Sequence, residues 1–318
     1  FYEVKYTFLL FGAVRFHLIK TKTMAKKIVC YGESLWDLLP SGKIAGGAPM
    51  NVAFHLQNFG SDVTMISRVG EDELGDELIQ FLDQKGLNTG YIQRDAEHPT
   101  GVVEVTLDEK GSPSYEIIKN VAWDHIAAEE KVLELVKDAD ALVFGSLACR
   151  NYRSQKTLFK LIDACPGLKI FDLNLRKPFY NRHLINDLMR KSDITKMNDE
   201  ELELVASWYL TNKSPKVQMA ELIDFADLEL MILTAGSEGA YCHNGEEAHF
   251  QEAFSVSVQD TIGSGDSFFA AFIHYYLSAA NPQDCLKYAC ATGALVATKP
   301  GGTPNLDQEM IDDFIANH

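Results

Sequence analysis

Short apolar runs alternate with helical stretches along most of this chain. The apolar runs that read as buried strands are Ile28–Tyr31, Val63–Ser67, Ala141–Phe144, Lys169–Asp172, Ile194–Met197 and Leu228–Leu233. Helical patterns follow them at Met50–Phe59, Glu73–Lys85, Ser154–Ala164, Leu184–Lys191 and Asp199–Ser207, and then at 266–279, 282–298 and 307–317. Parallel strands need long crossover connections, so this alternation predicts an α/β fold: a mostly parallel sheet with helices on both faces.

Two extended stretches interrupt the alternation. One covers Ser34–Ile44, and in the other, Gly101–Lys119, two strand-like runs flank a turn at Glu109–Pro113. Such segments predict a small second sheet beside the main one. We therefore expect one main domain over residues 24–318, with lid segments near 34–46 and 99–122. Residues 1–23 are expected to be an N-terminal extension, non-native or disordered, because Met24-Ala-Lys-Lys leads directly into the first strand.

The charge and cysteine content exclude several classes of protein. A net charge of −16 disfavours binding to nucleic acid and to anionic membranes, which both select basic surfaces. The uncharged run between Lys5 and Arg15 is too short to cross a bilayer, which takes about 20 residues. The six cysteines form no Cys-x-x-Cys pair and the histidines form no zinc motif. These features predict a cytoplasmic protein with free thiols.

The segment Asp260-Thr-Ile-Gly-Ser-Gly-Asp266 opens an apolar helix. Its glycines let backbone N–H groups converge, and the helix start adds partial positive charge, so the turn predicts an anion site. A carboxylate at Asp266 would repel a bound phosphate. Its presence is explained if Asp266 takes the proton from a hydroxyl that attacks a phosphoryl group. The segment therefore predicts phosphoryl transfer to an alcohol.

A second glycine pair lies in Gly46-Gly-Ala-Pro-Met-Asn51, before a predicted helix. The glycines permit close approach to a ligand, and Asn51 offers an amide to sugar-type hydroxyls. A plain glycine turn with a helix cap explains the same residues. The dinucleotide fingerprint Gly-x-Gly-x-x-Gly is absent after Tyr31, and the chain has no Gly-x-x-x-x-Gly-Lys-Ser/Thr loop for phosphate.

Taken together, these motifs resemble the ribokinase-like (phosphofructokinase-B type) carbohydrate kinase family, and within it fructokinases. The similarity runs from about Lys27 to the C-terminus. Further segments that carry it are Gly32-Glu-Ser-Leu-Trp-Asp37, Val69-Gly-Glu-Asp72, Ala122-Trp-Asp124, Asp172-Leu-Asn-Leu-Arg176, Asn198-Asp-Glu-Glu201, Thr234-Ala-Gly-Ser-Glu-Gly239 and Pro300-Gly-Gly-Thr-Pro304. The resemblance implies a three-layer αβα sandwich with a small β lid, and an ATP-dependent kinase.

The resemblance also implies roles for individual residues. Asp266 would be the general base, beside the phosphoryl-binding amides of Gly263, Ser264 and Gly265. Ser264 stands where the family usually carries Ala, a small change that should keep the turn. The residues expected to bind the acceptor sugar are Asp37, Gly46, Gly47, Asn51, Arg176 and Arg150. Trp123 would either close over the sugar or pack within the lid.

On the nucleotide side, Asn198 and Glu201 lie one helical turn apart and would order Mg²⁺ through water; an N-cap followed by an acid explains them as well. The residues expected around ATP are Thr234, Gly236, Gly239 and Gly302. The resemblance also implies a monovalent cation, K⁺, at Asp260, Ile262 and Asn305.

The function predicted is that of a fructokinase that phosphorylates the 6-hydroxyl of fructose. Alternatives within the family are a 2-keto-3-deoxygluconate kinase, a ribokinase or a nucleoside kinase. A nucleotide-dependent oxidoreductase is disfavoured by the missing fingerprint, and a non-catalytic sugar-binding protein by the intact Asp266. The expected partners are ATP and a small sugar, with a homodimer formed through the lid.

Overall fold

The computed structural model describes residues 25–39, 42–107, 113–211 and 214–318, and the predicted extension 1–23 lies outside them. Its core is a nine-stranded sheet of order β13-β12-β11-β10-β9-β8-β1-β4-β5. The strands are β1 Lys27–Tyr31, β4 Asp62–Gly70, β5 Ile92–Asp95, β8 Ala141–Gly145, β9 Leu168–Asp172, β10 Ile194–Asn198, β11 Leu230–Thr234, β12 Gly239–His243 and β13 Ala248–Glu252. Only the pairings of β12 are antiparallel.

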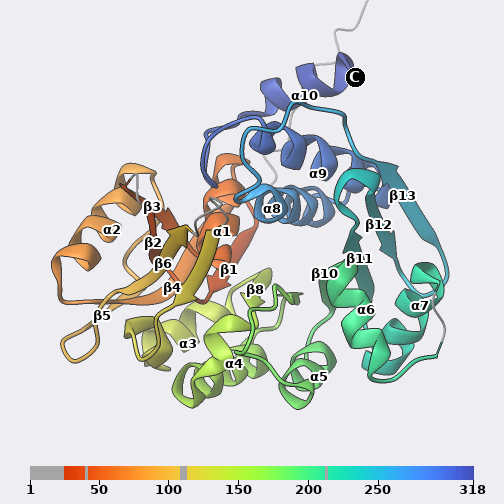
Figure 1. Cartoon of the computed structure of the whole chain (residues 1–318). Coiled ribbons are helices and arrows are strands. Elements are labelled where there is room, and N and C mark those ends of the chain that lie inside the picture. The colour runs from red at the N-terminus through yellow and green to blue at the C-terminus, as the bar shows by residue number, and fades with distance from the viewer. Residues whose placement is uncertain (1–24, 40–41, 108–112, 212–213) are drawn as a thin grey trace, which may run out of the picture.

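Helices cover both faces of this sheet (Figure 1). One face packs against α1 Ala48–Asn58, α2 Glu73–Gln84, α8 Ser264–Leu277 and α9 Pro282–Ala297. The other packs against α3 Glu130–Lys137, α4 Tyr152–Ala164, α5 Arg182–Arg190, α6 Asp199–Ser207 and α7 Pro215–Ala226. In β1, Ile28 and Cys30 face the first group of helices, while Val29 and Tyr31 face the second. This alternation explains why the strands read as continuous apolar runs.

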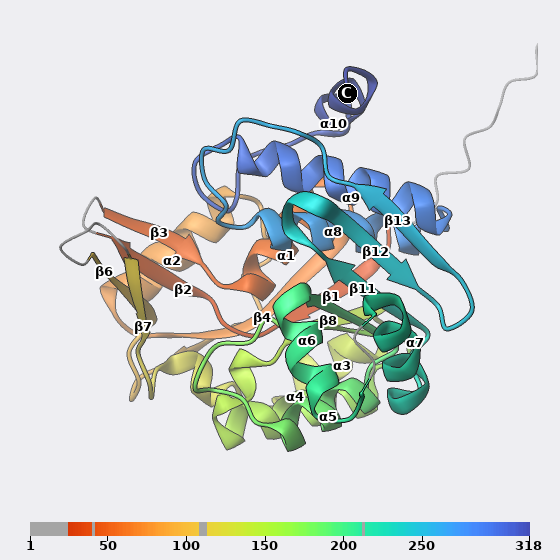
Figure 2. The ribbon, with the colours of Figure 1, turned by 45° about the vertical axis from the view of Figure 1, so that its right-hand side comes forward.

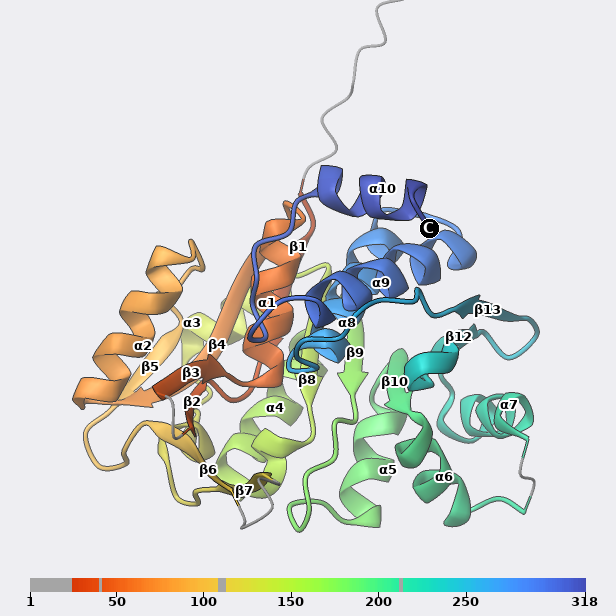
Figure 3. The ribbon, with the colours of Figure 1, turned by 45° about the horizontal axis from the view of Figure 1, so that its top comes forward.

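The C-terminal helix α10, Gln308–Ala316, packs on the outer side of α9 (Figure 3). The chain therefore forms the predicted three-layer αβα sandwich. Among the described residues, no helix is both long and apolar enough to span a membrane.

The small second sheet has the order β3-β2-β6-β7. It consists of β2 Leu35–Leu39, β3 Gly42–Gly46, β6 Gly101–Leu107 and β7 Pro113–Ile117, and it stands beside the central sheet (Figure 2). Strands β2 and β6 pair in parallel, although more than sixty residues separate them in the sequence. Trp36 fastens β2 to α2: its Nε1 donates to the carbonyl of Leu74 at 2.9 Å, and its ring meets Phe81 edge-on.

Some elements differ from the sequence-based expectation. Helix α1 begins at Ala48 rather than Met50, because Gly47 is its N-cap and Pro49 fits the first turn. The antiparallel strands β12 and β13 were not expected from the sequence. Strand β13 is half exposed along its length, so it lacks the apolar run by which the other strands are recognised.

Candidate active site

Most of the predicted residues lie along one edge of the central sheet, where its parallel strands end. The register of β9 and β10 places Asp172 opposite Lys196, and that of β10 and β11 places Asn198 opposite Thr234. The start of α8 reaches the same edge, because a Cβ built on Gly265 would lie 3.8 Å from the Lys196 ammonium nitrogen. In open α/β sheets this is the edge at which ligands bind.

The turn before α8 closely approaches another loop. Gly263 is the N-cap of α8 with φ 72°, and a Cβ at Gly263 would lie 2.4 Å from the Cα of Gly302. Both observations restrict position 263 to glycine. Gly302 in turn accepts a hydrogen bond at its carbonyl from the buried His55 ring, Nε2 to O 2.9 Å. The C-terminal loop, fixed by His55, therefore packs against the turn and holds its position.

Ser264 holds this turn together. Its N–H donates to the carbonyl of Thr261 at 3.2 Å, and its hydroxyl donates to the carbonyl of Gly293 in α9 at 3.0 Å. The amide of Ser264, expected to bind the phosphoryl group, is thus already engaged. The amides of Gly263 and Gly265 remain the better candidates, since the first N–H groups of a helix have no intrahelical acceptor.

Asp266 follows in the first turn of α8 and meets Asn51 of α1. The Asn51 Nδ2 donates to its Oδ2 at 2.8 Å, although the two residues are 215 positions apart. Burial raises the pKa of Asp266, and the Asp172 carboxylate raises it further. The Asn51 hydrogen bond and the charges of Lys196 and Arg176 oppose this rise without cancelling it. A carboxylate with a raised pKa is a stronger base, as proton abstraction requires.

Lys196 is a site residue that sequence reasoning missed. Its side chain is 8% exposed and its ammonium lies 3.0 and 3.3 Å from the two oxygens of Asp172. Burial alone would lower the pKa of Lys196, but the carboxylates of Asp172, Glu201 and Asp266 raise it, so the side chain stays charged. A lysine inside the apolar run Ile194–Met197 was the available signal, because buried lysines are rare unless paired.

The first glycine pair lies beside the carboxylate of Asp37. A Cβ on Gly46 would lie 2.4 Å from Oδ2 of Asp37, so the carboxylate packs directly against the glycine backbone. Burial raises the pKa of Asp37 to about 6, against the opposing charge of Arg176. Arg176 is exposed, and its charge also acts on Asp266. Asn51 and Arg176 thus act directly on Asp266, and Arg176 links Asp37, which packs against Gly46, to the same group of charges.

Arg150 does not join this group. It forms a buried ion pair with Asp124, at 2.7 and 2.8 Å, and donates to the carbonyl of Ile118 at 2.6 Å. Its guanidinium lies 3.9 Å from the ring centre of Trp123. These bonds tie the end of β7 to the main domain, so the expected role in substrate binding is not supported.

Trp123 is likewise a core residue and cannot cover a sugar. It is fully buried, and a Cβ on Gly101 would lie 2.2 Å from its Nε1. Of the two alternatives for Trp123, packing beneath the small sheet is the one that the structure contains.

Asn198 and Glu201 form a reciprocal capping box at the start of α6. The Asn198 Oδ1 accepts the N–H of Glu201 at 2.8 Å, and Glu201 Oε2 accepts the N–H of Asn198 at 2.9 Å. Glu201 Oε1 accepts the N–H of Leu175 at 2.7 Å. Burial and the Asp172 charge raise the pKa of Glu201. The structure therefore contains the predicted N-cap. Because both Glu201 oxygens already accept backbone N–H groups, their remaining lone pairs suit a water molecule.

Asp260 joins the α8 turn to the C-terminal loop. Its two oxygens accept the N–H of Ile262 and the N–H of Gly301, both at 3.0 Å. Asn305 is exposed, and none of the hydrogen bonds among the described residues joins it to Asp260. Nor do three or more His, Cys, Asp or Glu side chains gather as metal ligands within the described ranges.

The three remaining nucleotide-side residues lie in the turn from β11 to β12. Thr234 ends β11 beside Asn198, and Gly236 has φ 52° with open space around it. Gly239 has φ 129°, and a Cβ there would lie 2.1 Å from the carbonyl oxygen of Gln251 in β13. Gly239 is thus required by the packing of the β12–β13 hairpin, whereas Gly236 leaves room beside its backbone.

Comparisons with known proteins show the family of this chain. Residues 25–309 match the model of the pfkB family carbohydrate kinases. The chain belongs to this family. It is 28% identical over 311 residues to "Probable fructokinase-3" of Arabidopsis thaliana, with 89% of both chains covered.

Solved structures of similar fold include two with ATP. An uncharacterized sugar kinase from Pyrococcus horikoshii in complex with ATP has a TM-score of 0.76 at 27% identity, covering 87% of this chain and 94% of its own. A fructokinase from Xylella fastidiosa with bound ATP has a TM-score of 0.82 at 21% identity, covering 92% and 99%. The ribokinase-like fold and the assignment as an ATP-dependent carbohydrate kinase are thus confirmed.

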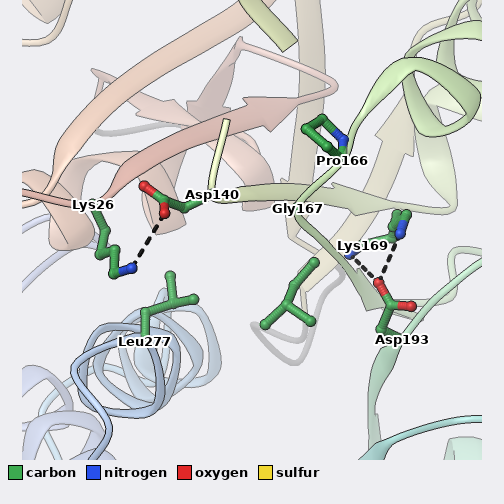
Figure 4. A pocket seen from close by; sticks show the side chains of 8 residues that line it. Lys26, Asp140, Pro166, Gly167, Lys169, Asp193 and Leu277 are labelled. Atoms are coloured by element: carbon green, nitrogen blue, oxygen red, sulfur yellow. Dashed lines mark hydrogen bonds and ion pairs between the residues drawn. The ribbon is translucent and has the colours of Figure 1, made fainter. Parts of the chain in front are cut away.

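Two surface hollows differ in their relation to the site of this pfkB-family kinase. One, of about 440 Å³, lies at the amino ends of the strands and is lined by the ion pairs Lys26–Asp140 and Lys169–Asp193 (Figure 4). It lies at the edge opposite to the carboxyl-end residues. The other, of about 520 Å³, includes Arg176 and Lys119 and borders the small sheet. Only the second adjoins the candidate acceptor site.

Proposed function

We propose that this pfkB-family kinase transfers the γ-phosphoryl group of ATP to the 6-hydroxyl of fructose, with Asp266 as the general base. The observation that carries the proposal is the position of Asp266. It lies in the first turn of α8, hydrogen-bonded to Asn51 at 2.8 Å, with a raised pKa and a buried lysine close to the same turn. The oxygen that loses its proton to Asp266 attacks the phosphorus as the bond to ADP breaks.

The acceptor sugar would lie between Asp266 and the small sheet. Asp37 offers carboxylate oxygens to a pair of hydroxyls, and Gly46 and Gly47 leave the backbone accessible. Arg176 supplies positive charge beside the carboxylates. The small sheet would act as a lid, and its closure would exclude water and limit ATP hydrolysis. The domain limits 24–318, with lid segments near 34–46 and 99–122, belong to this proposal.

The transferring phosphoryl group would be bound at the start of α8. The amides of Gly263 and Gly265 and the partial charge of the helix favour an anion, and the Lys196 ammonium adds a full positive charge near Gly265. ATP would extend from here past Thr234 and Gly236, with Gly239 and Gly302 shaping the loops around it. Mg²⁺ supplies charge neutralisation when bound with the phosphates, and Glu201 and Asn198 fit it through water only, since both are engaged in the capping box.

A monovalent cation, K⁺, at the loop of Asp260 and Ile262 is a separate part of the proposal. The carboxylate of Asp260 retains lone pairs after accepting two N–H groups, and the carbonyl of Ile262 is nearby in sequence. Asn305 is left out, because its exposed side chain has no bond to Asp260 among the described residues. A homodimer through the lid and a cytoplasmic location both stay predictions; the six cysteines are free and buried, which fits a reducing compartment.

A second candidate acceptor is a sugar acid such as 2-keto-3-deoxygluconate. The hollow beside the small sheet is lined by Lys119, Arg176 and Lys177, against a single acid, Glu116. This excess of positive charge would favour a carboxylate on the acceptor. No comparable observation favours ribose or a nucleoside.

A panel of acceptors tests the proposal. Purified enzyme is supplied with ATP and Mg²⁺, and ADP release is measured with fructose, 2-keto-3-deoxygluconate, ribose and adenosine. We expect the highest kcat/KM with fructose. A preference for 2-keto-3-deoxygluconate would favour the second candidate, and turnover with none of the four would contradict the proposal.

A further inference from the structure

Glu33 is a buried carboxyl group that the proposed mechanism does not use. It follows β1 and is 4% exposed, yet its Oε2 has no hydrogen-bond partner among the described residues. Folded proteins rarely leave a buried carboxyl oxygen unpaired, because the lost hydration is then not replaced by any hydrogen bond. Such an atom needs an explanation.

The surroundings of Glu33 are those of the acceptor site. Its backbone carbonyl and Cγ pack against Gly47, where an added Cβ would lie 2.4 and 3.4 Å away from them. The charges of Arg176 and Asp266 both act on its carboxyl group. Burial raises the pKa of Glu33 to about 7; its own N–H and the charge of Arg176 lower it, and Asp266 raises it.

A purely structural role accounts for part of the carboxyl group. Helix α1 has no side-chain cap at Gly47 and no acid in its first turn. The N–H of Ala48, the first residue of α1, interacts with the Glu33 carboxyl, as does the N–H of Glu33 itself. Glu33 therefore caps α1 from outside the helix. This role does not involve Oε2, which stays unpaired.

We propose that Glu33 is a specificity-determining residue of the acceptor site, whose Oε2 forms a hydrogen bond with one hydroxyl of the acceptor sugar. The inference rests on the proposed function, since it presumes a polyhydroxylated acceptor beside Gly47 and Asp266. A hydroxyl suits this position, because it donates to an ionised carboxylate and accepts from a protonated one. Asp37 and Glu33 would then contact the sugar from the two sides of the glycine pair.

The test compares monodeoxy analogues of fructose in wild-type enzyme and in two variants. Kd values are measured calorimetrically at pH 8, where Glu33 is mostly ionised, for fructose and each analogue. Wild type should bind one analogue about 10- to 100-fold more weakly than fructose, since that analogue lacks the hydroxyl that pairs with the carboxylate. In Glu33→Met this discrimination should vanish, and in Glu33→Gln, which still caps α1, it should fall several-fold.

Two controls keep the test decisive. Asp307→Asn weakens the carboxylate cap of α10 at the far end of the chain and should leave every ratio unchanged. Thermal unfolding shows whether each variant is folded, and if Glu33→Met is not, Glu33→Gln alone decides. If a folded Glu33→Gln discriminates as strongly as wild type against every analogue, Glu33 is only a helix cap and the inference is wrong. If wild type binds no fructose at all, the proposed function fails first, and the same series with the acceptor preferred in the panel then decides on Glu33.

Discussion

The phosphate side and the acceptor side of the site differ in how their polar side chains are paired. On the phosphate side, both oxygens of Glu201 accept backbone N–H groups, those of Asn198 and Leu175. Both oxygens of Asp260 likewise accept backbone N–H groups, those of Ile262 and Gly301. On the acceptor side, Glu33 Oε2 and Asn51 Oδ1 are buried without partners among the described residues. Of these four side chains, Asn51 bonds to Asp266, and the charge of Asp266 acts on Glu33.

This difference follows from the ligands that each side would bind. Phosphate oxygens only accept hydrogen bonds, so backbone amides and one ammonium are sufficient, and the acids there serve to fix loops. A sugar hydroxyl donates as well as accepts, so the acceptor side needs free oxygens. The cost of leaving them unpaired is recovered when the sugar binds. Substitutions on the phosphate side should therefore mainly lower kcat, whereas substitutions on the acceptor side should mainly weaken sugar binding.

The largest effect is expected from Asp266→Asn, where the two sides meet. The amide cannot take a proton, so kcat should fall by about 10²- to 10⁴-fold, while the Kd for fructose changes little. Steady-state kinetics and calorimetry measure the two quantities. Asp199→Asn, which alters an exposed acid near the phosphate side, is the matched control. A kcat close to that of wild type in Asp266→Asn would contradict the assigned base.

Lys196→Met tests the phosphate side. The variant removes the positive charge beside Gly265, so kcat should fall by about 10- to 10³-fold with the Kd for fructose unchanged. It also leaves Asp172 buried without its partner, which should cost about 3–5 kcal/mol in the free energy of unfolding. Adding Asp172→Asn should restore much of the stability but not the rate. A double variant that recovers both would show that Lys196 is only structural.

The pH dependence of sugar binding tests the acceptor side. Asp37, with a pKa of about 6, accepts hydrogen bonds from sugar hydroxyls with both oxygens only when it is ionised. Its ionised fraction falls as the pH drops through 6, so fructose affinity should weaken toward pH 5, by up to about tenfold per pH unit below the pKa. ATP affinity should stay flat over the same range. In Asp37→Asn the change in fructose Kd near pH 6 should disappear. If the Kd of this variant depends on pH as in wild type, Asp37 does not bind the sugar.

The smallest effect is expected from Asp260→Asn. The amide retains one oxygen for Ile262 but leaves the N–H of Gly301 without an acceptor, at a cost of about 1 kcal/mol in unfolding free energy. The cation site is tested by measuring kcat in KCl and in tetramethylammonium chloride at the same concentration, for wild type and variant; the variant should lose activation by K⁺. Activation that is the same in both would place the cation elsewhere.

Local features of the site were predictable from the sequence, whereas its long-range pairs were not. The glycine turn before Asp266 and the capping box of Asn198 and Glu201 depend on neighbours within a few residues, and the structure contains both. The bond from Asn51 to Asp266 and the ion pair of Lys196 with Asp172 depend on helix packing and strand register. No pattern in a single sequence determines those.

Arg150 shows how a residue type can mislead. The family resemblance implied substrate contact for Arg150, but Asp124, 26 residues earlier, pairs with its guanidinium in a buried ion pair. Glu33 shows the opposite case. Nothing in Gly32-Glu-Ser-Leu separates a structural acid from a sugar ligand, and only the unpaired Oε2 singles it out.

The central claim, phosphoryl transfer from ATP to the 6-hydroxyl of fructose, is tested most directly by the structure of the product. Enzyme, ATP, Mg²⁺ and fructose are incubated, and the products are identified by ³¹P and ¹H NMR. The account predicts ADP and fructose 6-phosphate in equal amounts. ADP with free phosphate and unmodified fructose, or a phosphate on another hydroxyl, would contradict it.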